Sequence, residues 1–171
     1  LKQWPWAESV NVPLIMRWPD EIPAATRDRT PFATVDVAPT LCGLAGIKQD
    51  DRIEGTDRSR SVRGETDDCP EEALLGLPAP IGIDGVPEWR GLRTPRYTYV
   101  RSRNGEQWLL YDNVEDPYQL HNRALDASHR DLRESLDERL DDWLEQTEDQ
   151  FLATKNQLRH AGVVEEWNEM Q

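Results

Sequence analysis

The sequence has little cysteine and no long hydrophobic run, and each absence excludes a class of protein. Its two cysteines, Cys42 and Cys69, are too few to form a disulfide framework. No apolar stretch approaches the roughly 18 residues that a membrane-spanning helix needs, and no signal peptide is visible. We therefore expect neither a disulfide-stapled scaffold nor a membrane protein.

Positive charge is also scarce. The chain has 33 Asp and Glu residues against 20 Lys and Arg, which gives a net charge of −13. Nucleic acid and anionic membrane surfaces are poor partners for such a chain. Lysine occurs only at positions 2, 48 and 155, so 17 of the 20 basic residues are arginine. Two explanations stay open. One is a simple compositional bias. The other is adaptation to concentrated salt, which screens the repulsion between the protein's negative charges; this second explanation would favour a cytoplasmic location.

The first nineteen residues are the most informative stretch. An aromatic loop, Trp4-Pro5-Trp6, is followed by the apolar run Val12–Met16, which Pro13 and Pro19 bracket. A short apolar run of this kind predicts a strand buried on both faces. Such a strand needs neighbours on both sides, and no element precedes it. We therefore expect the back part of a larger protein or, alternatively, a non-catalytic interaction module that pairs with another chain through this strand.

Downstream patterns predict further regular elements. Asp36 is placed to cap a helix that has Pro39 in its first turn and ends at Gly46. Asn104-Gly105 predicts a hairpin between two strands, and leucines three and four residues apart predict a long amphipathic helix. The expected elements are a helix at 37–45, a surface loop at 49–70 with a helical turn at 58–62, strands at 72–77, 89–101 and 107–111, a helix at 128–149, and a tail at 151–171 that docks.

Four segments, in the same order, resemble segments of the sulfatases, which belong to the alkaline-phosphatase-like superfamily. The first, K-Q-W-P-W-A-E-S-V-N-V-P-L-I-M-R-W-P, is similar to K-x-x-x-Y-E-E-S-x-R-V-P-L-I-x-R-x-P. The others are Val35–Gly46, Trp89–Val100 and Leu109–Asn122, of which the last is similar to L-Y-D-L-x-x-D-P-x-E-x-x-N-L. At Gly55–Gly64 the chain departs from the family's G-x-x-L-x-P-x-L-x-G, because it lacks the leucines and the proline.

The resemblance implies an α/β fold, α+β in its C-terminal part. Residues 1–64 would form the end of an alkaline-phosphatase-like α/β domain. Residues 65–171 would form a subdomain with a small antiparallel sheet packed by a long C-terminal helix. The implied activity is hydrolysis of sulfate monoesters in a sulfated small molecule or glycan. A phosphonate or phosphate monoester hydrolase of the same superfamily is the alternative.

The same resemblance implies a formylglycine nucleophile, made from Cys or Ser in C/S-x-P/A-x-R, and a divalent metal, calcium by family likeness. Neither Cys42 nor Cys69 lies in that motif. Cys42 is expected to be a small buried side chain in a helix, and Cys69, in an acidic loop, a poor nucleophile. Nucleophile and metal are therefore expected from a missing N-terminal part, and this fragment alone is expected to be inactive.

No metal site is predicted within this chain. Its acidic pairs lie in polar loops, and its histidines are scattered without the spacing of a ligand set. We interpret the acidic pairs, Asp50-Asp51 and Asp67-Asp68, as solvated surface residues; the scattered histidines are His121, His129 and His160.

Five residues are candidates for contact with substrate. Lys2 matches the family lysine that approaches the sulfate oxygens, where an ammonium would neutralise developing charge; the alternative is a solvated lysine. Trp4 and Trp6 would follow it at the pocket rim, facing an organic leaving group; ordinary packing is the preferred explanation for these rings. Arg93 and Arg96 would reach an anionic substrate, unless they are solvated residues flanking a strand.

Overall fold

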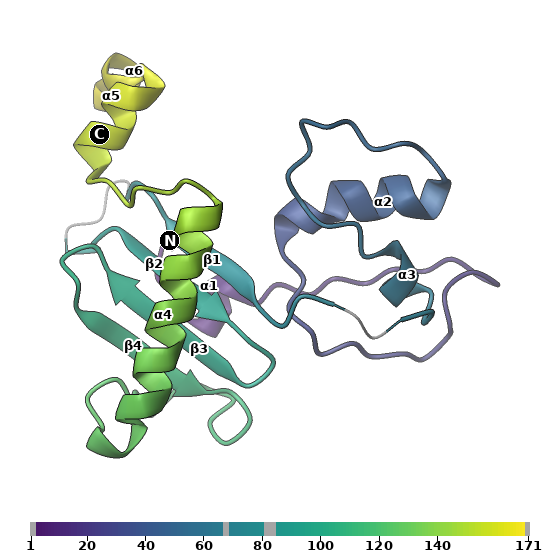
Figure 1. Ribbon diagram of the computed structural model, residues 1–171, viewed down its shortest axis with the longest axis horizontal. Coiled ribbons are helices and arrows are strands. Elements are labelled where there is room, and N and C mark those ends of the chain that lie inside the picture. Colours follow the sequence, from purple (N-terminus) through teal and green to yellow (C-terminus); the bar gives the residue numbers. More distant parts are fainter. Residues whose placement is uncertain (1–2, 67–68, 81–84, 170–171) are drawn as a thin grey trace. The chain divides into compact units, whose positions relative to one another are not determined.

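The computed structural model describes residues 3–66, 69–80 and 85–169 (Figure 1). The chain divides into two compact units. The sheet unit combines Leu1–Val12 with Leu74–Gln171, and the helical unit is Pro13–Ala73. The sheet unit is α+β, with a four-stranded antiparallel sheet and a long helix against it.

The sheet runs in the order β1-β2-β3-β4, with each strand beside the next along the chain. β2 pairs antiparallel with β3, with Leu92 opposite Tyr99, and β3 pairs antiparallel with β4, with Tyr99 opposite Leu110. The strands expected at 72–77 and 107–111 are confirmed. The bounds are β1 Ala73–Leu77, β2 Trp89–Arg93, β3 Tyr97–Ser102 and β4 Gln107–Asp112.

The prediction of a single strand at 89–101 is wrong, because a tight turn divides this segment into β2 and β3. Thr94 makes this turn: its N–H donates to the Tyr97 carbonyl at 2.9 Å, and its hydroxyl accepts from the Tyr97 N–H at 2.7 Å. Pro95 has no N–H to give to a ladder, so it suits the turn. The second hairpin is confirmed at Gly105, whose φ of +85° favours glycine.

One face of the sheet is covered by α4 (Arg130–Gln146), which follows the short 3-10 turn η2 (Ala127–His129). The helix expected at 128–149 is confirmed over most of that range. Its leucines lie four residues apart on one stripe, as a helix that covers a sheet requires. The buried cluster they form with the sheet contains Leu92, Tyr99, Leu110, Ala124, Leu136, Leu140 and Leu144.

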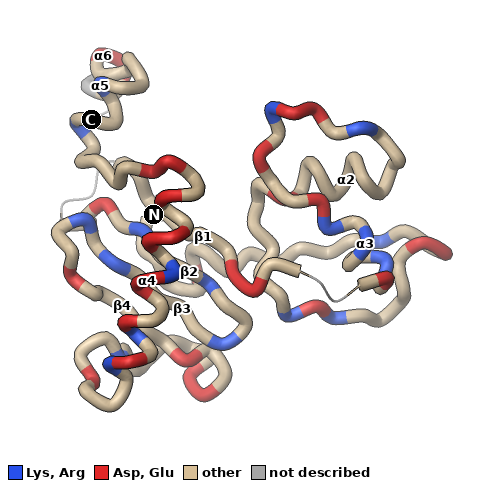
Figure 2. Tube along the Cα trace, viewed as in Figure 1, with Lys and Arg blue, Asp and Glu red and all other residues tan. Residues whose placement is uncertain are grey.

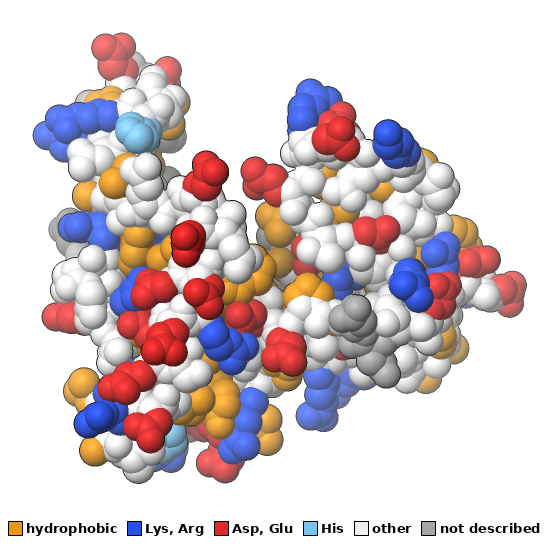
Figure 3. All heavy atoms as spheres, viewed as in Figure 1, with side chains coloured by type: hydrophobic (Ala, Val, Ile, Leu, Met, Phe, Trp, Pro, Cys, Tyr) orange, Lys and Arg blue, Asp and Glu red, His pale blue; other side chains and the backbone are white. Residues whose placement is uncertain are grey.

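Hydrogen bonds and ion pairs also hold α4 against this face of the sheet. The Tyr99 hydroxyl donates to Asp137 at 2.6 Å, and Arg101 reaches Asp137 at 2.9 Å and Asp141 at 2.6 Å. Burial and the Asp137 carboxylate raise the pKa of Tyr99, so its hydroxyl stays a proton donor. Acidic residues recur along α4 (Figure 2), and acidic side chains gather on the molecular surface over this helix (Figure 3).

The opposite face of the sheet carries a second cluster, of Trp89, Val100, Leu109 and Tyr111. The N-terminal segment packs here through the short helix α1 (Ala7–Val10), whose Val10 contacts the cluster. The indole N–H of Trp89 donates to the Gln3 carbonyl at 2.9 Å. Segments more than 80 residues apart in the sequence therefore meet on this face.

The helical unit contains η1 (Thr34–Asp36), α2 (Val37–Ala45) and α3 (Ser59–Val62). The helix expected at 37–45, its Gly46 cap with φ +67° and the turn near 58–62 are all confirmed. Asp36 does precede α2, but its carboxylate accepts from the N–H groups of Ala33 and Thr56 instead of from α2. It joins two loops and does not cap the helix through its side chain.

The buried strand expected at Val12–Met16 is wrong. This segment has no strand conformation, and Ile15 is 90% exposed. Among the described residues no strand lies beside this segment to form hydrogen bonds with its backbone N–H and C=O groups. Without such a partner the segment cannot become part of a sheet.

The tail contains α5 (Thr154–Ala161) and α6 (Val164–Glu169). The beginning of the tail docks on the sheet unit: Phe151 packs on the α4 cluster, and the Thr154 N–H and hydroxyl both donate to Glu88 at 2.7 Å. α5 buries none of its residues. Among the described residues no helix has the length and apolar character to span a membrane.

Candidate functional site

The structure brings two of the predicted site residues together on the sheet unit. The rings of Trp4 and Trp6 stack with their centroids 4.8 Å apart and their planes 17° from parallel. Trp108 of β4 lies beside Trp4, at 5.6 Å and 51°. Pro5, between them, is buried, and the extended backbone places side chains two positions apart on the same side. Lys2 lies outside the described residues.

A buried glutamine fixes the position of this aromatic segment. Gln119 accepts a hydrogen bond from the Ala7 N–H at 2.8 Å, and its own amide donates to Asn113 at 2.9 Å and to the Thr98 hydroxyl at 3.2 Å. It is 8% exposed, and its φ of +54° is one that non-glycine residues rarely adopt. That conformation costs roughly 1 kcal/mol, which the three hydrogen bonds offset.

The stacked tryptophans and this glutamine border an open hollow of about 440 Å³. This volume lies in the usual range for small-molecule sites. Two of the other lining side chains, Tyr118 and Leu120, are 79% and 74% exposed, so they form a projecting rim. The described residues that line it are Gln119, Trp4, Trp6, Glu8, Ser9, Tyr118 and Leu120.

Carboxylates dominate the charge around the hollow. Burial raises the pKa of the nearby Tyr111 hydroxyl, and the carboxylates of Asp116 and Glu8 raise it further. The pKa of Asp116 is itself lowered, first by the Leu120 N–H and also by the His121 N–H, which both donate to it. Asp116 is therefore ionised at neutral pH and adds negative charge near Tyr111.

The two candidate arginines are engaged elsewhere. Arg93 donates to the Thr98 hydroxyl at 2.7 Å, and burial lowers its pKa. It is linked to Gln119 only through that shared hydroxyl and does not line the hollow. Arg96 pairs with Asp112 at 2.7 Å and Glu115 at 3.2 Å. The contact of any of these residues with substrate stays a prediction.

Sequence reasoning missed Gln119 and Tyr118. Their segment, D-P-Y-Q-L-H-N, was visible in the family resemblance, but the residues before Tyr118 indicated only an acidic turn. The bond from Ala7 to Gln119 joins positions 112 residues apart. Local pattern carries no information about a contact over that distance.

No group of three His, Cys, Asp or Glu side chains that would suit a metal ion occurs in the described part of the chain. Asp50 pairs with Arg52, whose guanidinium lowers the pKa of Asp50 to about 2. Asp67 and Asp68 lie outside the described residues. The donor set for the divalent metal of the family resemblance is therefore not found among these residues.

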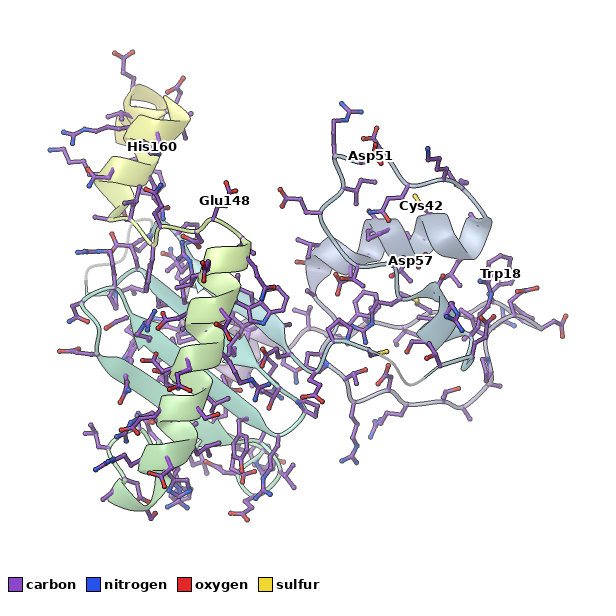
Figure 4. All side chains as sticks on the ribbon, in the orientation of Figure 1. Trp18, Cys42, Asp51, Asp57, Glu148 and His160 are labelled. Carbon is purple, nitrogen blue, oxygen red and sulfur yellow. The ribbon has the colours of Figure 1, made fainter. Side chains whose placement is uncertain are left out.

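Both cysteines are half-buried and unpaired. Cys42 lies on α2, in the helical unit (Figure 4), where burial of the thiol is only partial. Cys69 borders a small hollow of about 150 Å³ beside Asp57 and Arg58.

Comparisons with known proteins agree with this architecture. The family model for the C-terminal region of N-sulphoglucosamine sulphohydrolase matches residues 1–146, so the match ends with α4. An ulvan-active sulfatase of Formosa agariphila is 36% identical over 95% of this chain and 32% of its own length. An endo-4-O-sulfatase of Bacteroides thetaiotaomicron is 28% identical over 90% of this chain and 33% of its own.

The solved structures show the same relationship. The putative sulfatase yidJ from Bacteroides fragilis superposes with a TM-score of 0.65 and 27% identity, over 78% of this chain and 29% of that one. This chain spans about a third of the length of the curated relatives it matches. It belongs to the N-sulphoglucosamine sulphohydrolase C-terminal family, the C-terminal region of sulfatases in the alkaline-phosphatase-like superfamily.

Proposed function

We propose that this chain is the C-terminal part of an enzyme that hydrolyses sulfate monoesters of a glycan. The observation that carries the proposal is the family match over residues 1–146. The relatives support a glycan because one is named for activity on ulvan and another as an endo-sulfatase.

The nucleophile and the metal come from residues outside this sequence. In this proposal a formylglycine attacks the sulfur and a divalent cation, calcium by resemblance, neutralises the sulfuryl oxygens. Residues 1–64 complete the catalytic α/β domain, and residues 65–171 form its C-terminal subdomain. The chain by itself is inactive, because it supplies neither group.

In this proposal the chain contributes Lys2 and the contacts that position the segment around it. Lys2 donates to the sulfate oxygens and stabilises the charge that develops on the leaving oxygen. Ala7, five residues further on, is clamped by Gln119 at 2.8 Å. Because five residues span at most about 18 Å, the hydrogen bond that fixes Ala7 also limits how far from Ala7 the Lys2 residue can lie. The C-terminal subdomain thus acts as a positioning element for a catalytic lysine.

The test compares the isolated chain with the longer protein encoded in frame upstream of Leu1. We expect the isolated chain to release no sulfate from an aryl sulfate or a sulfated oligosaccharide, and the longer protein to do so. Lys2→Ala in the longer protein should lower kcat/KM roughly 10²–10³-fold, and Lys2→Gln should give a similar loss while keeping the side-chain length.

Two results would contradict the proposal. Metal-dependent turnover by the isolated chain would show that it has its own catalytic groups. A longer protein that cleaves phosphonate or phosphate monoesters but leaves sulfate esters intact would assign it to a different reaction of the same superfamily.

A further inference from the structure

The hollow on the sheet unit combines exposed aromatic surface with negative charge. Trp6 is 37% and Tyr118 79% exposed. Among the described residues that line it, Glu8 is acidic and none is Lys or Arg. Large exposed aromatic side chains gathered at a concave site indicate a binding surface.

The chemistry of this lining fits one class of ligand. Aromatic faces carry partial negative charge, and the C–H bonds on the flat face of a sugar ring carry a small positive charge, so the two stack. The Glu8 carboxylate and the Ser9 hydroxyl then offer hydrogen-bond partners to sugar hydroxyls.

The same lining disfavours an anionic sugar. Glu8 borders the hollow, and the Asp116 carboxylate acts on Tyr111 from the same region. A sulfate or uronate carboxylate here would meet the like charge of Glu8, and none of the described lining residues is Lys or Arg. At separations near 6 Å and intermediate dielectric this repulsion weakens binding roughly tenfold.

The hollow is also close to the proposed catalytic lysine. Trp4 is two residues from Lys2 in the sequence, so their Cα atoms are at most about 7 Å apart. The distance between Lys2 and the tryptophans is therefore about the width of one sugar ring. If a sulfate of the substrate contacts the Lys2 ammonium, the neighbouring sugar unit can lie on the tryptophans.

We propose that this hollow is a subsite for an uncharged sugar ring, adjacent to the unit whose sulfate is removed. The inference rests on the proposed function and narrows it: the substrate carries its sulfate on one unit, and the neighbouring unit on the hollow has neither sulfate nor carboxylate. Trp6 and Tyr118 stack on that ring, and Glu8 selects for its neutrality.

The first experiment titrates the folded 171-residue chain carrying Lys2→Gln, which removes the cation two residues from Trp4, with cellobiose and with a cellobiose sulfated on both rings, at matched ionic strength. Indole N–H signals are followed by NMR, and those of Trp4 and Trp6 are assigned by their loss in Trp4→Phe and Trp6→Phe. We expect cellobiose to shift both signals saturably in the millimolar range and the sulfated sugar to bind at least tenfold more weakly.

Variants separate stacking from charge. Tyr118→Ala should weaken cellobiose binding at least fivefold, while Trp18→Ala, which removes an exposed tryptophan of the helical unit (Figure 4), should leave it unchanged. Glu8→Gln should bring the sulfated sugar to within about threefold of cellobiose. Circular dichroism confirms that each variant is folded.

The inference is overturned if the sulfated sugar binds as well as the neutral one, if Glu8→Gln leaves the difference unchanged, or if cellobiose up to 100 mM shifts neither signal. The longer protein's release of sulfate is measured separately. Sulfate release without sugar binding by the chain rejects the subsite and leaves the proposed function intact, whereas binding without sulfate release supports the hollow as a sugar site and rejects the function.

Discussion

The two units of the molecule have different kinds of interior. The sheet unit buries two apolar clusters, one on each face of its sheet. In the described part of the helical unit, by contrast, buried polar residues outnumber apolar ones: Asp36, Thr40, Arg58 and Ser59 are buried together with Pro39, Leu44 and Ala73. The sheet unit also buries polar residues, but there the apolar ones predominate. Apolar burial is non-directional, whereas polar groups stabilise an interior only when their partners are in place.

Arg58 shows how the helical unit is held. Its guanidinium donates to the Pro31 carbonyl at 2.9 Å and to the Thr30 hydroxyl at 3.1 Å, and lies 3.8 Å from the Asp36 carboxylate. Its backbone N–H donates to the Thr40 hydroxyl at 3.0 Å. One buried cation thus joins several loop segments, so the helical unit depends on single contacts more than the sheet unit does.

The largest expected effect is in the apolar core. Leu140 is fully buried between α4 and the sheet. Leu140→Ala should therefore lower the free energy of unfolding of the sheet unit by about 4 kcal/mol, through lost burial and the cavity left behind. Urea unfolding measures it. Leu125→Ala, at a residue 95% exposed, is the control and should change stability by less than about 0.5 kcal/mol. A loss below about 1 kcal/mol for Leu140→Ala would contradict the described core.

In the helical unit the corresponding change is Arg58→Met. It keeps much of the side-chain volume but leaves Asp36 buried without its cation, at a cost of about 3 kcal/mol. Hydrogen exchange should accelerate across α2 and α3 while the sheet strands keep their protection. Arg60→Met changes an arginine whose side chain is 72% exposed and should leave both units unaffected. Equal acceleration in the strands would show that the two interiors do not respond separately.

A smaller effect is expected where polar contacts occur within the sheet unit. Gln119→Ala removes the acceptor of the Ala7 N–H, which costs about 2 kcal/mol locally. Exchange of the Ala7 amide should increase about 30-fold, while the amides of β3 stay protected. Leu120→Ala, at the exposed neighbour, should not alter it. An unchanged Ala7 amide would mean that Gln119 does not hold the N-terminal segment.

The smallest effect is pH-dependent. Burial alone would raise the pKa of Glu88, but the N–H and hydroxyl of Thr154 and the guanidinium of Arg103 outweigh it and bring the pKa to about 2. Because the pKa is lower in the folded state, the stabilisation is present above about pH 4.5 and is lost as the pH falls toward 2. Allowing for solvent screening, it amounts to about 1 kcal/mol.

NMR titration of the Glu88 carboxyl group tests this effect. Thr154→Ala should move its pKa upward and detach the beginning of the tail at a higher pH, whereas the apolar clusters should not respond. Gln157→Ala, on the same helix, serves as the control. A carboxyl group that titrates near 4.5 in the unmodified chain would show that the contact with Thr154 is not maintained.

Local patterns predicted elements of both units. The leucine spacing of α4, the Asn104-Gly105 hairpin and the Gly46 helix end each depend on nearby residues, and all three are confirmed. The turn at Thr94 was missed because Tyr97, Tyr99 and Val100, which all follow it, suggested one strand from residue 89, although Pro95 interrupts that run.

The site was only partly predictable. The sequence indicated Trp4 and Trp6 as neighbours, since two rings one residue apart fall on the same side of an extended backbone. It gave no sign of Gln119, whose role depends on a contact across the whole sheet unit. The strand expected at 12–16 failed for a related reason: an apolar run shows the capacity to pair, and pairing requires a second strand.

The absence of buried residues in α5 has a practical consequence. Phe151 packs on the α4 cluster and Thr154, the first residue of α5, donates to Glu88, whereas the rest of α5 buries no residue. A protease that cuts after Lys155 should therefore trim the chain without opening either apolar cluster. The shortened protein would be a natural starting point for crystallisation, and the removed helices could be replaced by a fusion partner.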